Sequence, residues 1–529
     1  MSEQPGTPPP ATYVHRILDS FAANGDREAL VNGSRRITYA EARTIVLQVA
    51  EAFRQSGLKK GDRVAMATGN TAEVELIQLA VHVIGAILIF VPAEPVPRER
   101  AVFLKRAAPD ALIFDKLFGQ GYELARQAET PRVFSVGPHA EAADLLALAA
   151  RMPAAPPDDE VTEDDILAVF YTGGTTGRPK MVLHRHKYYD TLLFAAGRRR
   201  AESQVPQRFL LCTTVNHGSG QMTAIMALLA GGTIILMDRF DAGQAIKLLI
   251  SEKATSIMLH PVMLYEVLDH PDFPPGGFPD LIRVYYGGAP TAPARLLEAI
   301  ERFGPILRQT YALTEVSLVT LMEPPEHDPS VPGRLSSCGR PLTQMAEVAV
   351  LDEDCAPVPA GQVGEVCVRG MTVMSEYWQD EEATREVFRG GWFHTGDAGY
   401  FDEDNYLYLV DRIKDVICTG NPMSNVYSKL LEDLLAEQSG VHAAAGFGLP
   451  DGQYGEAVHV ALVADADAVD TVALNKHVLE VLGPLYVPQS IVFVDSLPWT
   501  KVGKVDKKAL RATLAADAAD AAGAAAHTA

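Results

Sequence analysis

The chain has 529 residues, of which 47% are hydrophobic and 21% are charged, a composition typical of a globular protein with several domains. Its formal net charge is −21 and its pI is about 5.1, so the chain as a whole repels phosphate backbones and anionic lipid surfaces. These values argue against nucleic-acid and membrane partners, and a site for an anionic ligand has to be built locally.

The cysteines and the N-terminal residues indicate a cytoplasmic protein. The five cysteines are widely spaced and form no CxxC pair, so they predict neither a disulfide framework nor a zinc site: Cys212, Cys338, Cys355, Cys367 and Cys418. The N-terminal stretch MSEQPGTPPPATY is rich in proline and lacks the apolar core of a signal peptide. The most apolar segment, Leu79–Val91, is too short to span a bilayer.

Short apolar runs alternate with helical patterns through the first three quarters of the chain. The first expected elements are a strand, a helix, a strand, a helix and a strand, at Arg63–Met66, Thr71–Ile84, Ile87–Val91, Arg98–Ala107 and Ala111–Phe114. Further strands are expected at Ile166–Phe170, Phe209–Thr213, Thr233–Met237, Ser256–Leu259 and Ile282–Tyr286. This alternation predicts parallel sheets covered by helices on both faces, in more than one layer.

The pattern changes after Gly339. The alternating runs Ala346–Leu351 and Glu365–Arg369 are bounded by turn residues and predict a small antiparallel β unit. A compact α+β region follows, with a helix expected at Ser428–Gln438 and a strand at Ala457–Val463. The sequence therefore predicts a large N-terminal domain over residues 1–413, a small mobile domain over 414–512, and an alanine-rich tail over 513–529.

The stretch YTGGTTGRPKMVLHRH, residues 171–186, has the composition of a phosphate-binding loop. Glycines allow close backbone approach to a ligand, threonines supply hydroxyl donors, and Lys180 supplies a positive charge. The loop is not a Walker motif, because Gly177 is followed by Arg-Pro-Lys instead of Lys-Ser or Lys-Thr. Taken alone, these residues are also compatible with a flexible surface loop.

The ordered string TGGTTGRPK resembles the phosphate loop of the adenylate-forming superfamily, which includes acyl-CoA synthetases, adenylation domains of peptide synthetases and luciferases. Met181 stands where glycine is usual. Five further motifs follow in the family's order: YGGAP at 286–290, YALTE at 311–315, GWFHTGD at 391–397, DRIKD at 411–415 and TKVGKVDKKALR at 500–511. The resemblance covers about residues 10 to 512 and rests on the order of the motifs.

The resemblance implies an ATP-dependent ligase. A carboxylate or a similar oxyanion attacks the α-phosphate of ATP, pyrophosphate leaves, and an adenylate remains. Two anions then approach each other, so positive charge and oriented N–H groups are needed. Lys504, Thr314 and His217 are the implied catalytic residues, and Glu315 is the implied Mg²⁺ ligand. The residues implied to hold ATP are Thr172, Gly173, Gly174, Thr175, Thr176, Gly177, Lys180, Gly288, Ala289, Pro290, Tyr311, Ala312, Asp397 and Arg412.

Single residues carry these roles only as members of the set. Glu315 alone is compatible with a helix cap, and Asp397 with a turn residue. Lys504 lies in the run KVGKVDKK and alone reads as solvated surface. Lys414 is the implied hinge about which the small domain turns between two half-reactions, and an ordinary linker lysine is the alternative.

The acid pocket is expected beside the same motifs. Its expected lining residues are Asn216, His217, Tyr286, Gly287 and Ala312. His217 matches the family's HxxG motif and is expected to gate or pack and not to transfer protons. Ala312 replaces the usual glycine, and Tyr286 is bulky, so a small or aromatic acid is favoured over a long acyl chain.

The segment after the hinge departs from the family pattern. Residues 419–428 read TGNPMSNVYS, two residues longer than usual and containing Pro422. In CoA-forming relatives this loop lines the pantetheine tunnel, and proline fixes φ and removes a donor. A harmless insertion is one interpretation. The other is that the acceptor is not CoA.

Three functions remain open at this point. The first is a ligase that transfers the acyl group to CoA or to a carrier-protein thiol. The second is an adenylating enzyme with an amine acceptor, either for amide formation or for nitrite-dependent diazotisation of an aromatic amine. The third is a nucleotide-binding protein without turnover, which the presence of Lys504, Glu315 and Asp397 disfavours. The sequence does not identify the acid, the pathway or the oligomeric state.

Overall fold

The computed structural model describes residues 12–91, 97–118, 120–156, 161–172, 180–189, 197, 207–413, 416–418, 425–451, 455–465, 469–499 and 505–513. The chain divides into two compact units. Unit 1 comprises Met1–Leu335, Pro341–Glu347 and Arg369–Phe388, and unit 2 comprises Ser336–Arg340, Val348–Val368 and Arg389–Ala529. Residues 336–340, 348–368 and 389–413 therefore group with the C-terminal region in this division, whereas the sequence placed them in the N-terminal domain. The boundary after residue 413 remains a prediction.

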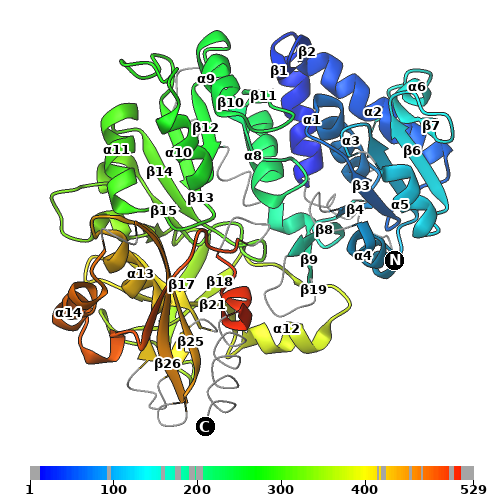
Figure 1. The fold of residues 1–529 in the computed structure, drawn as a ribbon. Helices are drawn as coiled ribbons and strands as arrows, with labels where there is room; N and C mark the ends of the chain where they lie inside the picture. The colour runs from blue at the N-terminus through cyan, green and yellow to red at the C-terminus, as the bar shows by residue number, and fades with distance from the viewer. Residues whose placement is uncertain are drawn as a thin grey trace, which may run out of the picture. The chain divides into compact units, whose positions relative to one another are not determined.

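Unit 1 contains two mainly parallel sheets, as the alternation of strands and helices predicts (Figure 1). Among the described residues one sheet has nine strands, in the order β16-β15-β14-β13-β12-β10-β11-β1-β2. The bounds in that order are Arg340–Pro341, Thr320–Met322, Leu307–Tyr311, Arg283–Gly287, Ser256–Leu259, Arg208–Leu211, Thr233–Leu236, Glu28–Asn32 and Arg35–Thr38. The strands from β14 to β1 pair in parallel, and β2 and β15 add antiparallel neighbours.

The second sheet has eight strands within the described ranges, in the order β19-β9-β8-β4-β3-β5-β6-β7. The bounds in that order are Glu376–Tyr377, Lys180–Arg185, Ile166–Thr172, Ile87–Phe90, Arg63–Ala67, Ala111–Asp115, Arg132–Val136 and Ala143–Asp144. The central strands are parallel and buried on both faces, which explains their continuous apolar runs. The antiparallel pair β8–β9 holds the two ends of the phosphate-loop motif.

Helices cover both sheets of unit 1. Helices α1, α2, α3 and α8 pack on one another between the sheets, at Tyr13–Asn24, Tyr39–Gln55, Ala72–Val83 and Gly218–Leu229. Helices α9, α10 and α11 cover the other face of the nine-stranded sheet, at Ala242–Ser251, Pro261–Asp269 and Pro293–Phe303. The remaining helices of unit 1 are α4, α5, α6 and α12, at Pro97–Ala107, Gly121–Gln127, Leu145–Ala149 and Glu381–Val387. The short 3-10 turns η1, η2 and η3 are at His186–Tyr189, Pro324–Glu326 and Arg334–Ser336.

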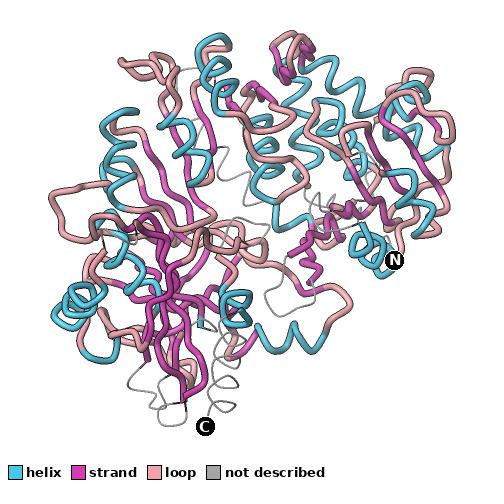
Figure 2. The backbone as a smooth tube through the Cα atoms, viewed as in Figure 1, coloured by secondary structure: helices cyan, strands magenta, loops and turns pink. Residues whose placement is uncertain are grey.

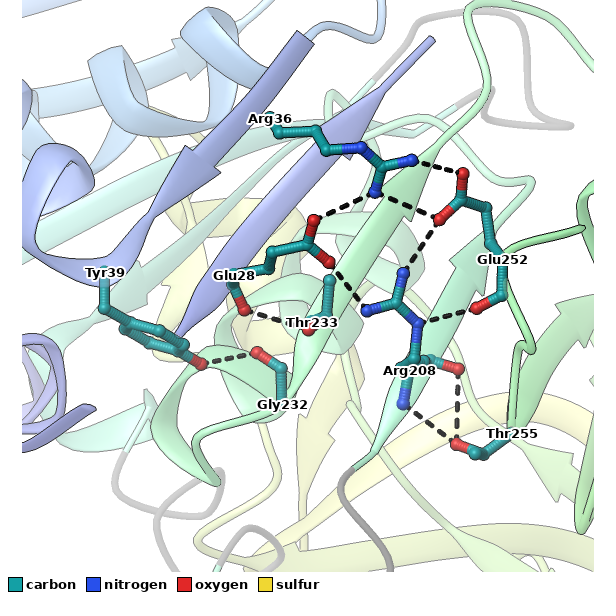
Figure 3. Close-up of polar contacts among 8 residues, drawn as sticks. All are labelled: Glu28, Arg36, Tyr39, Arg208, Gly232, Thr233, Glu252 and Thr255. Carbon is teal, nitrogen blue, oxygen red and sulfur yellow. Dashed lines mark hydrogen bonds and ion pairs between the residues drawn. The ribbon is translucent and has the colours of Figure 1, made fainter. Parts of the chain in front are cut away.

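An arginine–glutamate network closes the amino edge of the nine-stranded sheet (Figure 3). Arg36 contacts Glu252 Oε1 at 2.7 Å and Glu28 Oε1 at 2.9 Å, and Arg208 contacts the second oxygen of each carboxylate at 2.8 Å. Hydrogen bonding to Arg208 lowers the pKa of Glu28, and hydrogen bonding to Arg36 lowers the pKa of Glu252. The network joins β1, β2, β10 and the end of α9, at the edge opposite to the loops described below.

The small antiparallel β unit that the sequence predicts corresponds to a sheet that has five strands among the described residues. Its order is β17-β18-β21-β20, with β22 paired to β21, at Ala346–Leu351, Gly364–Gly370, Trp392–Phe401, Phe388–Arg389 and Leu407–Arg412. Strand β21 pairs with β18 and β22 in antiparallel fashion, as the alternating pattern predicts.

The C-terminal part of unit 2 is an α+β fold, as expected (Figure 2). Its three-stranded sheet, in the described residues, is β25-β26-β27, at Val441–Asp451, Gly455–Ala464 and Ser490–Phe493. The pair β23–β24 is at Ile417–Cys418 and Asn425–Val426, helices α13 and α14 are at Ser428–Ala436 and Thr471–Val481, and η6 is at Pro484–Tyr486. The helix and strand that the sequence predicts here are α13 and β26. In the part of the chain that the structure describes, no helix combines the length and the hydropathy that crossing a bilayer requires.

Candidate active site

Most of the predicted site residues of unit 1 that the structure describes lie at or just after the carboxyl ends of strands in the nine-stranded sheet. The parallel strands β10, β12, β13 and β14 end at Leu211, Leu259, Gly287 and Tyr311. The YGGAP and YALTE motifs begin in the last residues of β13 and β14, and Asn216 and His217 follow β10. Because parallel strands end at one edge, these loops gather on the same side of the sheet, where open α/β sheets bind their ligands.

Two pocket residues lie at the start of α8. His217 is the N-cap of this helix, and its Nδ1 accepts a hydrogen bond from the Ser219 N–H at 3.4 Å. The proton of the neutral ring is therefore on Nε2. Part of the His217 side chain is accessible to solvent. The protein atoms packed around the ring still remove hydration from it, and this desolvation lowers the pKa of His217 to about 4. Asn216 is held by Thr68 and by Gln78, whose Nε2 donates to Asn216 Oδ1 at 3.0 Å.

His260 is a residue of this edge that sequence reasoning missed. Its Nδ1 lies 3.0 Å from the Gly287 carbonyl oxygen, and a side chain at Gly288 would approach the ring to 2.8 Å. A positive charge on His260 would lower the pKa of His217 further. The signal available in the sequence was its position directly after the strand Ser256–Leu259.

Tyr286 was expected to line the acid pocket, and the structure places it in the hydrophobic core of the nine-stranded sheet. The side chain is fully buried, and its hydroxyl lies 3.0 Å from Gln309 Oε1 and 2.9 Å from His327 Nε2. This placement gives no support to the idea that Tyr286 limits the length of the acyl chain, which stays a prediction.

The remaining residues of the YGGAP and YALTE motifs follow β13 and β14. Gly288, Ala289 and Pro290 are at least partly exposed, and so are Tyr311, Ala312 and Thr314. His184 Nε2 donates a hydrogen bond to the Thr314 carbonyl oxygen at 2.9 Å, which fixes the backbone next to Glu315. The motif thus presents its polar side chains from a fixed backbone.

Glu315 and Lys180 meet at Tyr377, a second residue that the sequence did not indicate. The Tyr377 hydroxyl donates a hydrogen bond to Glu315 Oε1 at 2.9 Å, and Lys180 Nζ lies 4.4 Å from the centre of the tyrosine ring. Lys180 begins β9 and pairs with Thr172 at the end of β8, so the two ends of the phosphate-loop motif are neighbours. Residues 173–179 are outside the described residues. A carboxylate is a ligand that Mg²⁺ prefers, so Glu315 suits the implied metal.

Unit 2 contains the other predicted nucleotide residues, Asp397 and Arg412. They are cross-strand partners on β21 and β22, and Arg412 Nε lies 2.8 Å from Asp397 Oδ1. The Asp397 side chain is almost completely buried. A buried carboxylate with two acceptor oxygens can bind paired hydroxyl groups. Lys414 and Lys504 are outside the described residues, as is most of the long segment after the hinge, 419–424.

A group of possible metal ligands lies on β18 and on β21, the strand that carries Asp397. One ligand atom from each of Glu365, Cys367 and His394 lies within 4.8 Å of the others. However, Glu365 Oε1 accepts from the Gly396 N–H at 3.0 Å, and Glu365 Oε2 is 2.7 Å from His394 Nδ1. The guanidinium of Arg389 is 3.5 Å from the same oxygen and disfavours a second cation. These contacts brace the strand that carries Asp397.

The fold and the order of the motifs along the chain are those of ATP-dependent adenylate-forming enzymes. Family models agree, since the one described as AMP-binding enzyme matches residues 18–378 and the one described as AMP-binding enzyme C-terminal domain matches residues 430–504. The chain belongs to the AMP-binding enzyme family, and it is an ATP-dependent adenylate-forming ligase of the acid–CoA ligase type.

Individual relatives differ in their acceptors. The chain is 33% identical to a medium/long-chain fatty acid–CoA ligase of Mycobacterium tuberculosis, covering 95% of this chain and 90% of the relative. It is 32% identical to a feruloyl-CoA synthase of an Amycolatopsis species, covering 91% and 95% of the two chains. Its structure resembles that of an amide bond synthetase from Marinactinospora thermotolerans, with a TM-score of 0.85, 34% identity and coverage of 94% and 99%.

Proposed function

We propose that this protein activates a carboxylic acid with MgATP as an acyl-adenylate and then transfers the acyl group to CoA or to a carrier-protein thiol. The observation that carries the proposal is the set formed by Glu315, Tyr377 and Lys180 next to the paired ends of the phosphate loop. A carboxylate for a hard cation and an ammonium for phosphate oxygens are what an attack on the α-phosphate requires.

Each residue has a defined task in this proposal. Glu315 supplies an oxygen ligand to Mg²⁺, which neutralises charge on the phosphate oxygens when it is bound. Residues 172–180 bind the β- and γ-phosphates, and Thr314 contacts the α-phosphate. Asp397 accepts hydrogen bonds from the ribose hydroxyls, while the Arg412 guanidinium keeps its carboxylate oriented. Lys504 contacts the α-phosphate and the acid together, and Lys414 is the hinge between the half-reactions.

The acid pocket is proposed from residues that lie beside the family motifs. Asn216, His217, Gly287 and Ala312 are the proposed pocket residues, and a small or aromatic acid is favoured. Tyr286 is buried in the core, and its placement gives no support to a limit on the length of the acyl chain. Relatives named for ferulate and for medium and long fatty acids are both near a third identical to this chain, so both classes belong in a substrate panel.

Transfer to an amine is the second candidate function. The observation that favours it is the long post-hinge segment with Pro422, together with the 34% identity to an amide bond synthetase. In this reading the adenylate forms in the same way, and the attacking nucleophile is an amine. Nitrite activation followed by diazotisation of an aromatic amine belongs to the same alternative.

The experiment is pyrophosphate and AMP release from ATP with a panel of short, aromatic and long-chain acids and nitrite, each with CoA, with aromatic and aliphatic amines, or with neither. Mass spectrometry identifies the product. CoA-dependent turnover with a thioester product supports the first function. Turnover that does not depend on CoA and increases when an amine is added supports the second function, transfer to an amine. Absence of pyrophosphate release with every acid, from protein that binds ATP, would contradict both.

A further inference from the structure

Tyr377 lies in the segment 374–378, which connects the YALTE motif to β9, the strand that follows the phosphate loop. On one side, the Met374 N–H donates to the Glu315 carbonyl oxygen at 2.7 Å. On the other side, the Ser375 and Trp378 N–H groups donate to the carbonyl oxygens of Leu183 and Met181, on β9, at 3.0 and 2.7 Å. The segment therefore spans from the YALTE loop to the strand that follows the phosphate loop.

The Tyr377 side chain is fixed in this segment. The residue is 6% exposed, and its backbone pairs with Val182 in β9. Its N–H also donates to Thr384 Oγ1 at 3.0 Å, and Thr384 in turn donates to the Asp380 carbonyl oxygen at 2.7 Å. A side chain that is held in this way can orient the groups that it contacts.

Two contacts of the side chain go to groups with a proposed role in binding MgATP. The phenol O–H occupies Glu315 Oε1 and leaves Oε2 with no hydrogen-bond partner within the described part of the chain. The ring face attracts the Lys180 ammonium by a cation–π interaction. Because the phenol is neutral, it orients both groups without neutralising either charge. Losing a hydrogen bond that orients a metal-binding carboxylate typically lowers metal affinity or activity by about 10- to 100-fold.

We propose that Tyr377 is a positioning residue that holds the Glu315 carboxylate and the Lys180 ammonium in one arrangement for the metal and the triphosphate. The inference rests on the proposed function, since it assumes that these two groups bind MgATP. The hydroxyl acts on the metal through Glu315, and the ring acts on the phosphates through Lys180.

Two substitutions separate the two contacts. Tyr377→Phe removes the hydroxyl and keeps the ring, and Tyr377→Leu removes both. Calorimetric titration of ATP, with and without Mg²⁺ and without any acid, reports the contacts without knowledge of the substrate. We expect Tyr377→Phe to bind free ATP as the parent protein does. The factor by which Mg²⁺ increases the affinity for ATP should be about tenfold smaller in this variant than in the parent protein. Tyr377→Leu should in addition bind free ATP more weakly.

Tyr122→Phe is the matched control, because Tyr122 lies on α5 and packs against His139, outside the site. Thermal unfolding of all variants verifies that they fold. Equal Mg²⁺ dependence in Tyr377→Phe and the parent protein would overturn the proposal. If the parent binds ATP with no gain from Mg²⁺, the positioning role fails while the adenylating function stands. If the parent binds no ATP at all, both fail.

Discussion

At the scale of single residues, Glu75 is an ionisable group buried without a partner. It lies on α3, is fully buried, and neither carboxyl oxygen has a hydrogen-bond partner among the described residues. Burial raises the pKa of Glu75 to about 8, so the folded protein keeps a proton there at neutral pH. Gln78 and His82 follow at helical spacing and are also buried, which makes a polar stripe on an inward face.

The raised pKa of Glu75 predicts that the free energy of unfolding depends on pH. Between the unfolded pKa of 4.5 and the folded pKa of about 8, the folded state binds the extra proton, so stability falls as pH rises through this window. The substitution Glu75→Gln removes the ionisation and should stabilise the protein increasingly from pH 5 to pH 8.5. The pKa shift sets an upper limit of about 5 kcal/mol on this gain. Urea unfolding at the two pH values measures it, and a difference that does not change with pH would contradict the assignment.

Asp397 gives a second prediction at this scale. Its carboxylate is buried and paired with Arg412 at 2.8 Å, and its proposed task is to accept the ribose hydroxyls. Asp397→Asn should lower kcat/KM for ATP by about 10- to 100-fold, the usual effect of losing hydrogen bonds to a charged group. Steady-state kinetics at varied ATP measures this. Asp354→Asn, in an exposed turn, is the control and should leave the kinetics unchanged. A loss of the same size in both variants would count against the ribose role.

At the scale of elements, the end of β13 is constrained by two conditions that coincide at Gly288. Its φ is +86°, a conformation that other residues rarely adopt, and a Cβ atom would lie 2.8 Å from His260 Nδ1. Gly304, at the end of α11, has the same φ of +86°, but a Cβ atom added there would meet no described atom within 4 Å. The two glycines therefore share the backbone strain and differ in the steric contact.

This pair makes a controlled comparison. Gly288→Ala and Gly304→Ala should each destabilise the protein by about 1–3 kcal/mol from backbone strain. Only Gly288→Ala should also displace the His260 ring and lower adenylation activity. Unfolding measurements and pyrophosphate release on both variants check the expectation. Equal activity in the two variants at equal stability would show that the position of His260 does not matter.

At the scale of the whole molecule, a buried polar network in unit 2 connects the DRIKD motif to the segment that follows Lys504. Asp411 Oδ2 accepts from the Ser428 N–H at 2.8 Å and also contacts its hydroxyl, which in turn contacts Lys507 Nζ. Lys507 Nζ lies 2.8 Å from Glu432 Oε1, and both side chains are mostly buried. Desolvation raises the pKa of Glu432, and the neighbouring lysine partly opposes this effect.

Breaking this network should affect stability and catalysis together. Lys507→Met leaves Glu432 without its ion pair and should reduce the free energy of unfolding by about 3 kcal/mol. Because Lys507 is three residues after Lys504, adenylation should slow more than ATP affinity falls. Lys507→Arg should retain most of both properties, and Lys508→Met, at an exposed position, serves as control. Chemical unfolding and single-turnover kinetics test this, and an unchanged ratio of rate to affinity would contradict the link to Lys504.

The sequence by itself determined the order of strands and helices and the family. Apolar runs such as Ile87–Val91 and Ser256–Leu259 encode buried parallel strands locally, because every residue of such a strand faces a covered side. The motifs are also local, so their order was readable without coordinates. The site residues at strand ends followed from these two facts.

The tertiary structure alone decided which distant side chains meet. Tyr377 and Glu315 are 62 residues apart, and Arg36 and Glu252 are 216 apart. Periodicity states which face of an element is buried, but it does not state which other element covers that face. The position of Tyr286 in the YGGAP motif led us to expect it in the acid pocket, whereas the structure buries this side chain in the core of the nine-stranded sheet. Strand order and chain crossings fix such contacts, and these depend on the packing of the complete domain.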